Sequence, residues 1–243
     1  MNYKLFIGRS FSKIDNFLKR RNLKAVKKFY PWGRDFVFDL TRRFAGQDID
    51  IIVDAGANIG SVSLDFAYYF PHSKVLAFEP VFSTYERLKL KTSKYNNIIP
   101  VQIALGEGTY QVEISLNAED TINSISSKPD EQNISGKEVI SVSTLDAYIK
   151  QNNILKVDLL KIDVEGFEFK VLEGADNLLS NSIKAIVLEV GYERGDSKVH
   201  FSDVENYMEQ RGFQCCGVYD LSKSRDKKRL YYSNNLYIRK SLL

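Results

Sequence analysis

The chain has 243 residues, of which 44% are hydrophobic and 27% are charged. This length and composition exclude a disordered or collagenous chain and are typical of one α/β domain with or without a short extension. The net charge is only +3. Nucleic-acid-binding proteins usually carry a strong basic excess, so we expect no nucleic-acid partner.

The positive charge is concentrated at the N-terminus. Residues 1–34 contain ten Lys or Arg and one acid, which leaves 24 basic and 30 acidic residues in the rest of the chain. Apolar residues at helical spacing predict a helix over Ser10–Tyr30 with a basic opposite face. Two interpretations stay open: a solvated helix face, or a helix that lies on an anionic membrane surface or partner. We treat residues 1–48 as a basic N-terminal helical extension and residues 49–243 as the main domain.

The sequence also predicts the compartment. The two cysteines, Cys215 and Cys216, are neighbours and offer no disulfide framework, which favours a reducing environment. No apolar run approaches the roughly 20 residues of a membrane span, and the N-terminus is too short and too soon charged for a signal peptide. We therefore expect a cytoplasmic protein, with the basic helix as a peripheral contact to the inner face of the membrane.

From residue 49 the pattern alternates between short apolar runs and longer periodic segments. Because strands that alternate with helices form βαβ units, this half of the domain predicts a parallel sheet with helices on its faces. The expected elements, in chain order, are strand Ile49–Asp54, helix Ser61–Phe70, strand Lys74–Phe78, helix Pro80–Tyr95 and strand Ile98–Ala104.

The alternation stops over residues 106–143, where we expect a small insertion with a β-hairpin and a loop. Its predicted strands are Tyr110–Leu116 and Glu138–Ser143, joined by a polar loop, Asn117–Lys137. After it the alternation resumes, and the chain closes with two consecutive strands that must pair antiparallel. The expected elements are helix Thr144–Lys150, strand Val157–Ile162, helix Gly166–Leu179, strand Ile183–Val190, a helix from the cap Ser202 to Gln210, and strands Phe213–Val218 and Leu230–Arg239.

A glycine-containing turn joins the first strand to its helix. Its spacing, Asp54-x-Gly56-x-x-x-Gly60, matches neither the dinucleotide fingerprint nor a Walker phosphate loop. Asp54 would repel a phosphate but suits a ligand with an amino group and a sulfonium charge, such as S-adenosylmethionine. Glu79, at the end of the next strand, can accept both hydroxyls of a ribose.

Four segments together resemble the FkbM family of methyltransferases: residues 53–60 (VDAGANIG), 78–80 (FEP), 144–146 (TLD) and 160–166 (LKIDVEG). The resemblance covers roughly residues 50–240. It implies a class I (Rossmann-like) methyltransferase domain, with a mostly parallel seven-stranded sheet, helices on both faces and a terminal antiparallel hairpin. It also implies an S-adenosylmethionine-dependent O-methyltransferase, since members act on hydroxyls of sugars, glycans and macrolide-type products.

The resemblance further implies which residues bind the cofactor. The methionine end would contact Asp54, Gly56, Asn58 and Gly60. Glu79 would hold the ribose, and Ala104 and Leu105 would contact the adenine. Asn123 and Ser124, in the polar loop, would belong to a lid over the site.

Candidate catalytic residues follow the later strands. A sugar hydroxyl is a poor nucleophile when protonated, so a general base is expected, and Asp163, Glu189 and His200 are the candidates. Asp163 and Glu189 could instead bind the acceptor hydroxyl or Mg²⁺, and His200 could be an exposed bystander. Glu165 could simply cap the helix at Gly166.

The sequence thus favours methyl transfer to a hydroxyl of a sugar or glycan, lipid-linked if the basic helix lies on a membrane. Two alternatives stay open: a macrolide or polyketide O-methyltransferase, and a methyltransferase-fold partner subunit without turnover. The sequence does not indicate the oligomeric state.

Overall fold

The computed structural model describes residues 31–117, 134–194, 198–224 and 228–243. The predicted helix Ser10–Tyr30, and Asn123 and Ser124 of the predicted lid, lie outside the described residues. Among the described residues, no helix combines the length and hydrophobicity that a membrane span requires.

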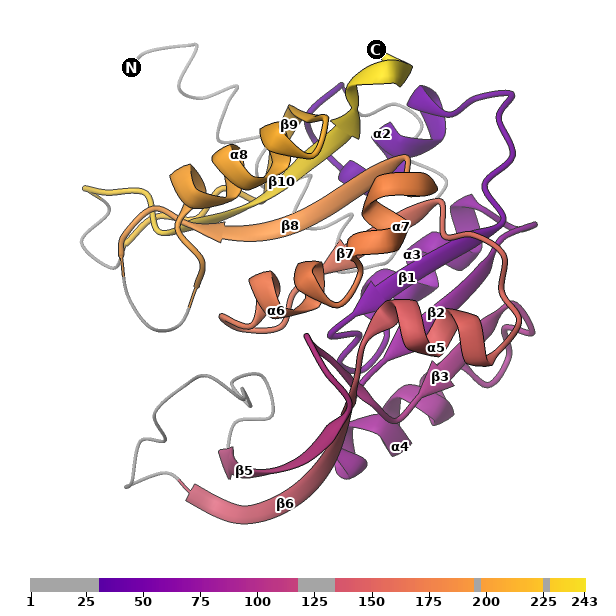
Figure 1. Ribbon diagram of the computed structural model, residues 1–243, viewed down its shortest axis with the longest axis vertical. Helices are drawn as coiled ribbons and strands as arrows, with labels where there is room; N and C mark the ends of the chain where they lie inside the picture. Colours follow the sequence, from indigo (N-terminus) through magenta and orange to yellow (C-terminus); the bar gives the residue numbers. More distant parts are fainter. Residues whose placement is uncertain (1–30, 118–133, 195–197, 225–227) are drawn as a thin grey trace, which may run out of the picture.

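A seven-stranded sheet in the order β3-β2-β1-β7-β8-β10-β9 forms the centre of the molecule (Figure 1). Its pairs are parallel except at β10, which lies between β8 and β9 and is antiparallel to both. This confirms the predicted class I Rossmann-like fold with its terminal antiparallel hairpin. The strands are β1 (Ile51–Ala55), β2 (Lys74–Phe78), β3 (Ile98–Val101), β7 (Leu159–Ile162), β8 (Ala185–Gly191), β9 (Phe213–Tyr219) and β10 (Tyr232–Arg239).

Helices cover both faces of this sheet, as predicted. Because successive strand side chains point to opposite faces, neighbours such as Ile52 and Val53 enter different cores. One core packs under α2 (Phe36–Arg43), α3 (Ser61–Tyr69) and α4 (Phe82–Thr92). The other packs under α5 (Leu145–Gln151), α6 (Glu168–Glu173), α7 (Asp176–Asn181) and α8 (Phe201–Gln210). A 3₁₀ turn, Lys240–Leu242, ends the chain.

The insertion forms a second sheet in the order β4-β6-β5, with β4 (Ala104–Leu105), β5 (Tyr110–Asn117) and β6 (Ile134–Ser143). Figure 1 shows the β5–β6 ribbon extending away from the main sheet. The predicted strand Ile98–Ala104 was therefore wrong in extent. It divides because Ala104 and Leu105 pair with Val142 and Ser143 of β6 rather than with β2.

Two predicted helices also differ from the structure. The predicted helix Gly166–Leu179 divides into α6 and α7 at Gly174, whose backbone lies so close to that of Gly106 that an added Cβ would be 1.9 Å from the Gly106 carbonyl oxygen. The last helix begins at Phe201 and is capped by His200, not by Ser202, because the His200 ring accepts the Ser202 amide.

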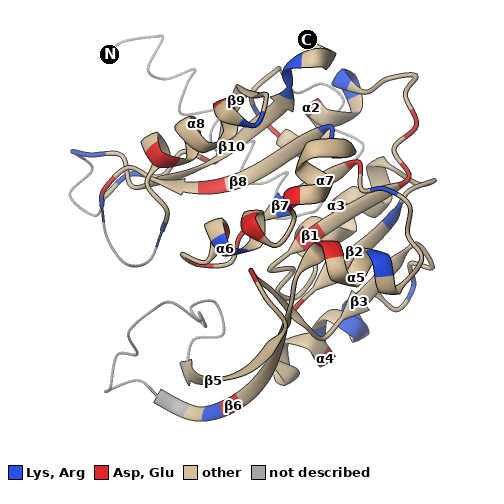
Figure 2. Cartoon of the chain, in the orientation of Figure 1, with Lys and Arg blue, Asp and Glu red and all other residues tan. Residues whose placement is uncertain are grey.

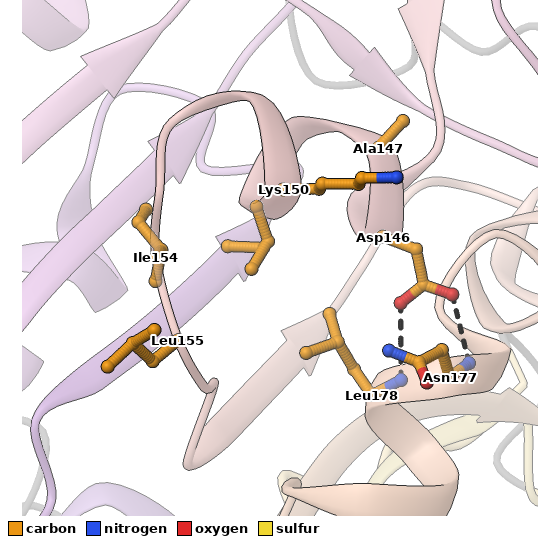
Figure 3. Close-up of a pocket in the computed structure, with 8 residues that line it drawn as sticks. Asp146, Ala147, Lys150, Ile154, Leu155, Asn177 and Leu178 are labelled. Atoms are coloured by element: carbon orange, nitrogen blue, oxygen red, sulfur yellow. Dashed lines mark hydrogen bonds between the residues drawn. The ribbon is translucent and has the colours of Figure 1, made fainter.

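The Thr144-Leu145-Asp146 segment builds structure rather than a ligand contact. Thr144 caps α5 by accepting the Ala147 amide. Asp146 accepts the Asn177 and Leu178 amides at 2.9 and 3.2 Å and so caps α7 (Figure 3). Asp146, Asn177 and Leu178 also border a hollow of about 400 Å³ between α5 and α7.

α2 lies inside the predicted N-terminal extension, yet its apolar side is part of the core. Phe36 contacts Phe66 and Tyr219 edge-on, and the Tyr219 hydroxyl donates to the buried Asp39 carboxylate at 3.0 Å. The segment from Phe36 onward is thus tied to β9. The boundary at residue 48 stays a prediction.

Candidate active site

Two glycines of the loop between β1 and α3 have a left-handed backbone and little space for a side chain. Gly56 has φ +75°, and an added Cβ would be 1.9 Å from the Asp163 carbonyl oxygen. Gly60 has φ +81°, and its Cβ would be 2.6 Å from Leu88 Cδ1. The first glycine therefore lets β1 and β7 end close together, and the second lets α3 approach α4.

Asp54, at the end of β1, is fully buried beneath this loop. Ser63 of α3 donates to its carboxylate at 2.6 Å, and Lys161, its register partner on β7, forms an ion pair with it at 3.3 Å. Lys161 also donates to the Gly56 carbonyl at 3.3 Å and pairs with Asp163 at 3.2 Å. The Asp54 carboxylate was predicted to contact the cofactor. In the structure the carboxylate holds Ser63 and Lys161 beneath the loop, and its contact with the cofactor stays a prediction.

Lys161 is the cation that joins these groups. Burial alone would lower its pKa, but the Asp163 and Asp54 carboxylates raise it above the ordinary lysine value. The lysine is therefore charged, and its ion pairs tie the ends of β1 and β7 together.

Glu79, at the end of β2, lies beside the same loop. Its two oxygens accept the Asn58 amide at 3.0 Å and the Val81 amide at 3.1 Å. Burial raises the pKa of Glu79 to about 7, although these two backbone hydrogen bonds oppose the shift. A carboxylate held by backbone at this strand end keeps lone pairs for further donors, as the predicted ribose contact demands.

Asn58, Ala104 and Leu105 complete the predicted cofactor set. Asn58 has φ +49°, and its side-chain oxygen accepts the Ile59 amide, so its backbone forms the turn. Ala104 and Leu105 are buried in two different cores. Their side chains therefore pack inward, and only the backbone of β4 remains for a ligand.

A second acidic group lies at the ends of β7 and β8. One carboxylate oxygen each of Asp163, Glu165 and Glu189 lies within 4.8 Å of the others. Figure 2 shows acidic positions on β1, on β8 and near the start of α6. Burial raises the pKa of Glu189 to about 7, and the Asp163 charge adds to the rise. Glu189 can therefore exchange a proton near neutral pH.

Lys198 neutralises part of this acidic group. Its ammonium donates to Glu165 at 3.0 Å and forms a second ion pair with Glu189. Glu165 was predicted to cap the helix at Gly166, and this was wrong. The Gly166 amide donates to Glu168 at 3.0 Å, while Glu165, at φ +52°, turns its side chain toward Lys198.

His200 is placed differently from the two acidic candidates. Its Nδ1 lies 2.8 Å from the Ser202 hydroxyl and caps α8. One ring nitrogen is thus committed to the helix end. Asp163 and Glu189, by contrast, lie together, and the choice of the base among the three candidates stays a prediction.

Comparison with known proteins identifies the family of the chain. The methyltransferase FkbM domain profile matches residues 54–215. "Methyltransferase 1" of Beauveria bassiana is 31% identical over 68% of this chain and 73% of its own length. The chain belongs to the FkbM methyltransferase family. "Hexuronic acid methyltransferase AglP" of Haloferax volcanii is 27% identical over 74% of this chain and 73% of its own length.

Among solved structures, the precorrin-6y C5,15-methyltransferase of Geobacter metallireducens aligns with 84% of this FkbM chain and 88% of its own. The identity is 14% and the TM-score 0.46.

Three residues near these carboxylates were not predicted from the sequence of this FkbM chain: Ser63, Lys198 and Glu168. Ser63 lies one helical turn after Gly60, on the helix side that faces Asp54, so the spacing gave a weak signal. Glu168 is fully buried, and burial raises its pKa to about 7. Lys198 gave no local signal, because its partners are 9 and 33 positions away.

The carboxylates of Asp163, Glu165 and Glu189 are oxygen donors of the type that Mg²⁺ prefers. In this FkbM structure, however, the Lys198 ammonium already pairs with two of the three. The positive charge that a cation would bring is thus supplied by the chain, and the predicted Mg²⁺ stays a prediction without support.

Proposed function

We propose that the chain is an S-adenosylmethionine-dependent O-methyltransferase that methylates a hydroxyl group of a sugar or glycan. The observation that carries the proposal is the placement of two sites at one edge of the sheet. A glycine loop with Glu79 lies at the ends of β1 and β2, and a proton-accepting carboxylate, Glu189, lies at the end of β8. In open α/β sheets this edge is where ligands bind.

The cofactor half fits an adenosyl ligand. Glu79 offers carboxylate oxygens to two hydroxyls, and the Gly56–Gly60 loop has glycine where side chains would fill the space beside β7 and α4. S-adenosylmethionine, when bound, supplies an electrophilic methyl carbon on a sulfonium. The fixed acids around Lys161 place negative charge below the loop, which favours a cationic ligand.

The acceptor half supplies the base. Glu189 takes the proton of the acceptor hydroxyl, and Asp163, which is one-third exposed, accepts a neighbouring hydroxyl and orients the sugar. General-base catalysis contributes about 10²- to 10⁴-fold, and alignment of the reacting atoms contributes more. The Haloferax relative, named as a hexuronic acid methyltransferase, supports a sugar acceptor.

The test uses the purified chain, methyl-labelled S-adenosylmethionine and a panel of neutral and uronic-acid glycosides together with a macrolide. We expect label transfer to a glycoside, in a product that resists mild alkali because it is an ether. An alkali-labile product would be an ester and would contradict hydroxyl methylation. Transfer to the macrolide alone, or cofactor binding with no transfer to any acceptor, would contradict the sugar assignment.

The Glu189→Gln variant tests the base. It should bind S-adenosylmethionine with unchanged affinity and lose about 10²-fold or more in kcat. Asn234→Ala is the matched control, since Asn234 is the register partner of Glu189 on β10. Wild-type kcat in Glu189→Gln would remove Glu189 from the mechanism.

A further inference from the structure

Lys198 bridges two carboxylates that come from different strands. Its side chain is only 11% exposed, and its ammonium contacts Glu165, after β7, and Glu189, at the end of β8. A buried ammonium is stable only when it is paired. One lysine therefore joins the acid-bearing turn after β7 to β8.

An aromatic ring on β10 and the residue next to the lysine also hold Lys198 in place. The ring centroid of Tyr232, on β10, lies 5.1 Å from the Lys198 ammonium, a distance typical of a cation–π contact. Next to Lys198, the Val199 carbonyl accepts the Gly191 amide at 2.8 Å, which fixes this residue against the end of β8. Contacts with Glu165, Glu189 and Tyr232 therefore fix the position of the ammonium.

Without a cation, the carboxylates would repel each other. Asp163, Glu165 and Glu189 lie within 4.8 Å, and like charges at that distance in a partly buried site raise one another's proton affinity. The charged groups that face Glu189 are Asp163, Glu165 and Lys198. Lys198 is the positive one among them, and it contacts Glu189 directly.

We propose that Lys198 is a positioning residue of the acceptor site: its ammonium holds Glu189 Oε2 and leaves Oε1 to take the proton of the acceptor hydroxyl. The lysine serves as the built-in cation of the acidic group in place of a divalent metal. The inference rests on the proposed function, because it assigns Glu189 the role of the base.

The consequence is a change in the proton affinity of Glu189. Burial and the Asp163 charge raise the pKa of this carboxyl to about 7, while Lys198 opposes the rise. Removal of the ammonium should therefore raise the Glu189 pKa further. A lysine whose charge did not act on Glu189 would not move this midpoint.

The first experiment needs no acceptor. Side-chain carboxyls of the full-length chain are labelled with ¹³C-glutamate, the Glu189 signal is assigned by its absence in Glu189→Gln, and its titration is followed by NMR. We expect Lys198→Met to move the midpoint upward by one pH unit or more and Lys198→Arg to keep it within half a unit. Lys240→Met is the control, since Lys240 pairs with Glu209 on the surface.

The second experiment measures turnover with a glycoside that accepts the methyl group. We expect Lys198→Met to lower kcat at pH 7 by 10- to 100-fold, to shift the acidic limb of the pH profile upward, and to leave the affinity for S-adenosylmethionine within twofold. Lys198→Arg should recover most of kcat, and Lys240→Met should match the wild type.

An unchanged Glu189 midpoint in Lys198→Met would overturn the inference, and so would a change in acceptor KM with kcat intact. If Lys198→Met does not fold, Lys198→Arg carries the test, and a shifted midpoint there would count against the proposal. The experiments distinguish failure of Glu189 as the base from failure of Lys198 as a positioning residue. Wild-type turnover in Glu189→Gln removes the base, whereas an inactive Glu189→Gln with a normal Lys198→Met removes only the role of Lys198.

Discussion

At the scale of single residues, the site consists of carboxylates whose surroundings give them different work. Asp54 is buried against the side chains of Lys161 and Ser63, which connect the end of β1 to β7 and α3. Glu79 and Glu189 lie at strand ends with the pKa of each carboxyl raised to about 7 by burial. The three carboxylates thus have different roles. Asp54 anchors the loop, Glu79 is a candidate cofactor ligand and Glu189 is a candidate base.

The raised pKa of Glu79 predicts a pH-dependent affinity for S-adenosylmethionine. Ribose hydroxyls donate to the ionised carboxylate, so binding should tighten as pH rises through about 7 and Glu79 loses its proton. For a group with that pKa, the expected gain between pH 6 and pH 8 is about tenfold. Isothermal titration calorimetry at both values measures it.

Glu79→Gln is the control for this experiment. It keeps the shape of the side chain and removes its titration, so it reports any pH dependence that comes from the cofactor's own amino group. Equal pH dependence in wild type and Glu79→Gln would show that Glu79 does not bind the ribose.

Substitution of Gly56 should destabilise the folded protein through steric overlap. In Gly56→Ala, the new Cβ would meet the Asp163 carbonyl at 1.9 Å with φ at +75°, which should lower the free energy of unfolding by about 2–4 kcal/mol. Gly212→Ala is the matched control, because Gly212 has φ +77° and no atom within 4 Å of the added Cβ.

The control variant should lose only the cost of the left-handed backbone, about 1 kcal/mol. Urea denaturation of both variants gives the comparison. Similar losses in the two would mean that the approach of β1 to β7 at Gly56 is not tight.

At the scale of elements, α7 is a short helix that depends on a cap from elsewhere in the chain. α7 has six residues and receives its cap from Asp146, 31 positions earlier. Since so short a helix is marginal by itself, this distant carboxylate and the packing of Leu178 and Leu179 hold it in place.

Asp146→Ala should therefore destabilise the protein by about 1 kcal/mol, the usual cost of a lost helix cap. Asp146→Asn keeps an oxygen acceptor and should recover most of the loss. Thermal denaturation of the three proteins measures the effect. Asn and Ala variants of equal stability would rule out the cap as the source.

At the scale of the whole molecule, charge is divided between a basic N-terminal segment and an acidic remainder. The net charge of +3 is the sum of +9 in residues 1–34 and −6 in the remaining chain. Each Lys or Arg near an anionic bilayer contributes about 1 kcal/mol to binding. We therefore propose that residues 1–34 attach the protein to anionic lipid or an anionic partner.

Replacement of Arg20 and Arg21 by Gln should weaken co-sedimentation with phosphatidylserine vesicles by about 30-fold, which corresponds to about 2 kcal/mol. The matched control replaces Lys89 and Lys94, on and after α4, by Gln. Equal sedimentation of the two double variants would reject a membrane role for the N-terminal segment.

Local sequence patterns were enough to predict the parallel sheet and the glycine loop with Glu79 at the neighbouring strand end. Strand and helix periods are local properties, and Gly56, Gly60 and Glu79 occur at strand ends that a local pattern reveals. Those residues could be predicted because a βα turn and the strand before it lie within a few positions. The same locality explains why the FkbM segments could be recognised without a structure.

Which charged groups neutralise one another is seen only in the three-dimensional arrangement of the chain. In this arrangement Asp54 is buried under the loop, and the predicted strand divides before Ala104. His200 caps a helix. The same arrangement brings Lys198 from the segment after β8 to Glu165, 33 positions earlier. Charge pairing depends on distance in space and on burial, and neither is a property of neighbours in the sequence. For that reason the pairing of Lys198 with Glu165 and Glu189 became visible only in the three-dimensional arrangement of the strands.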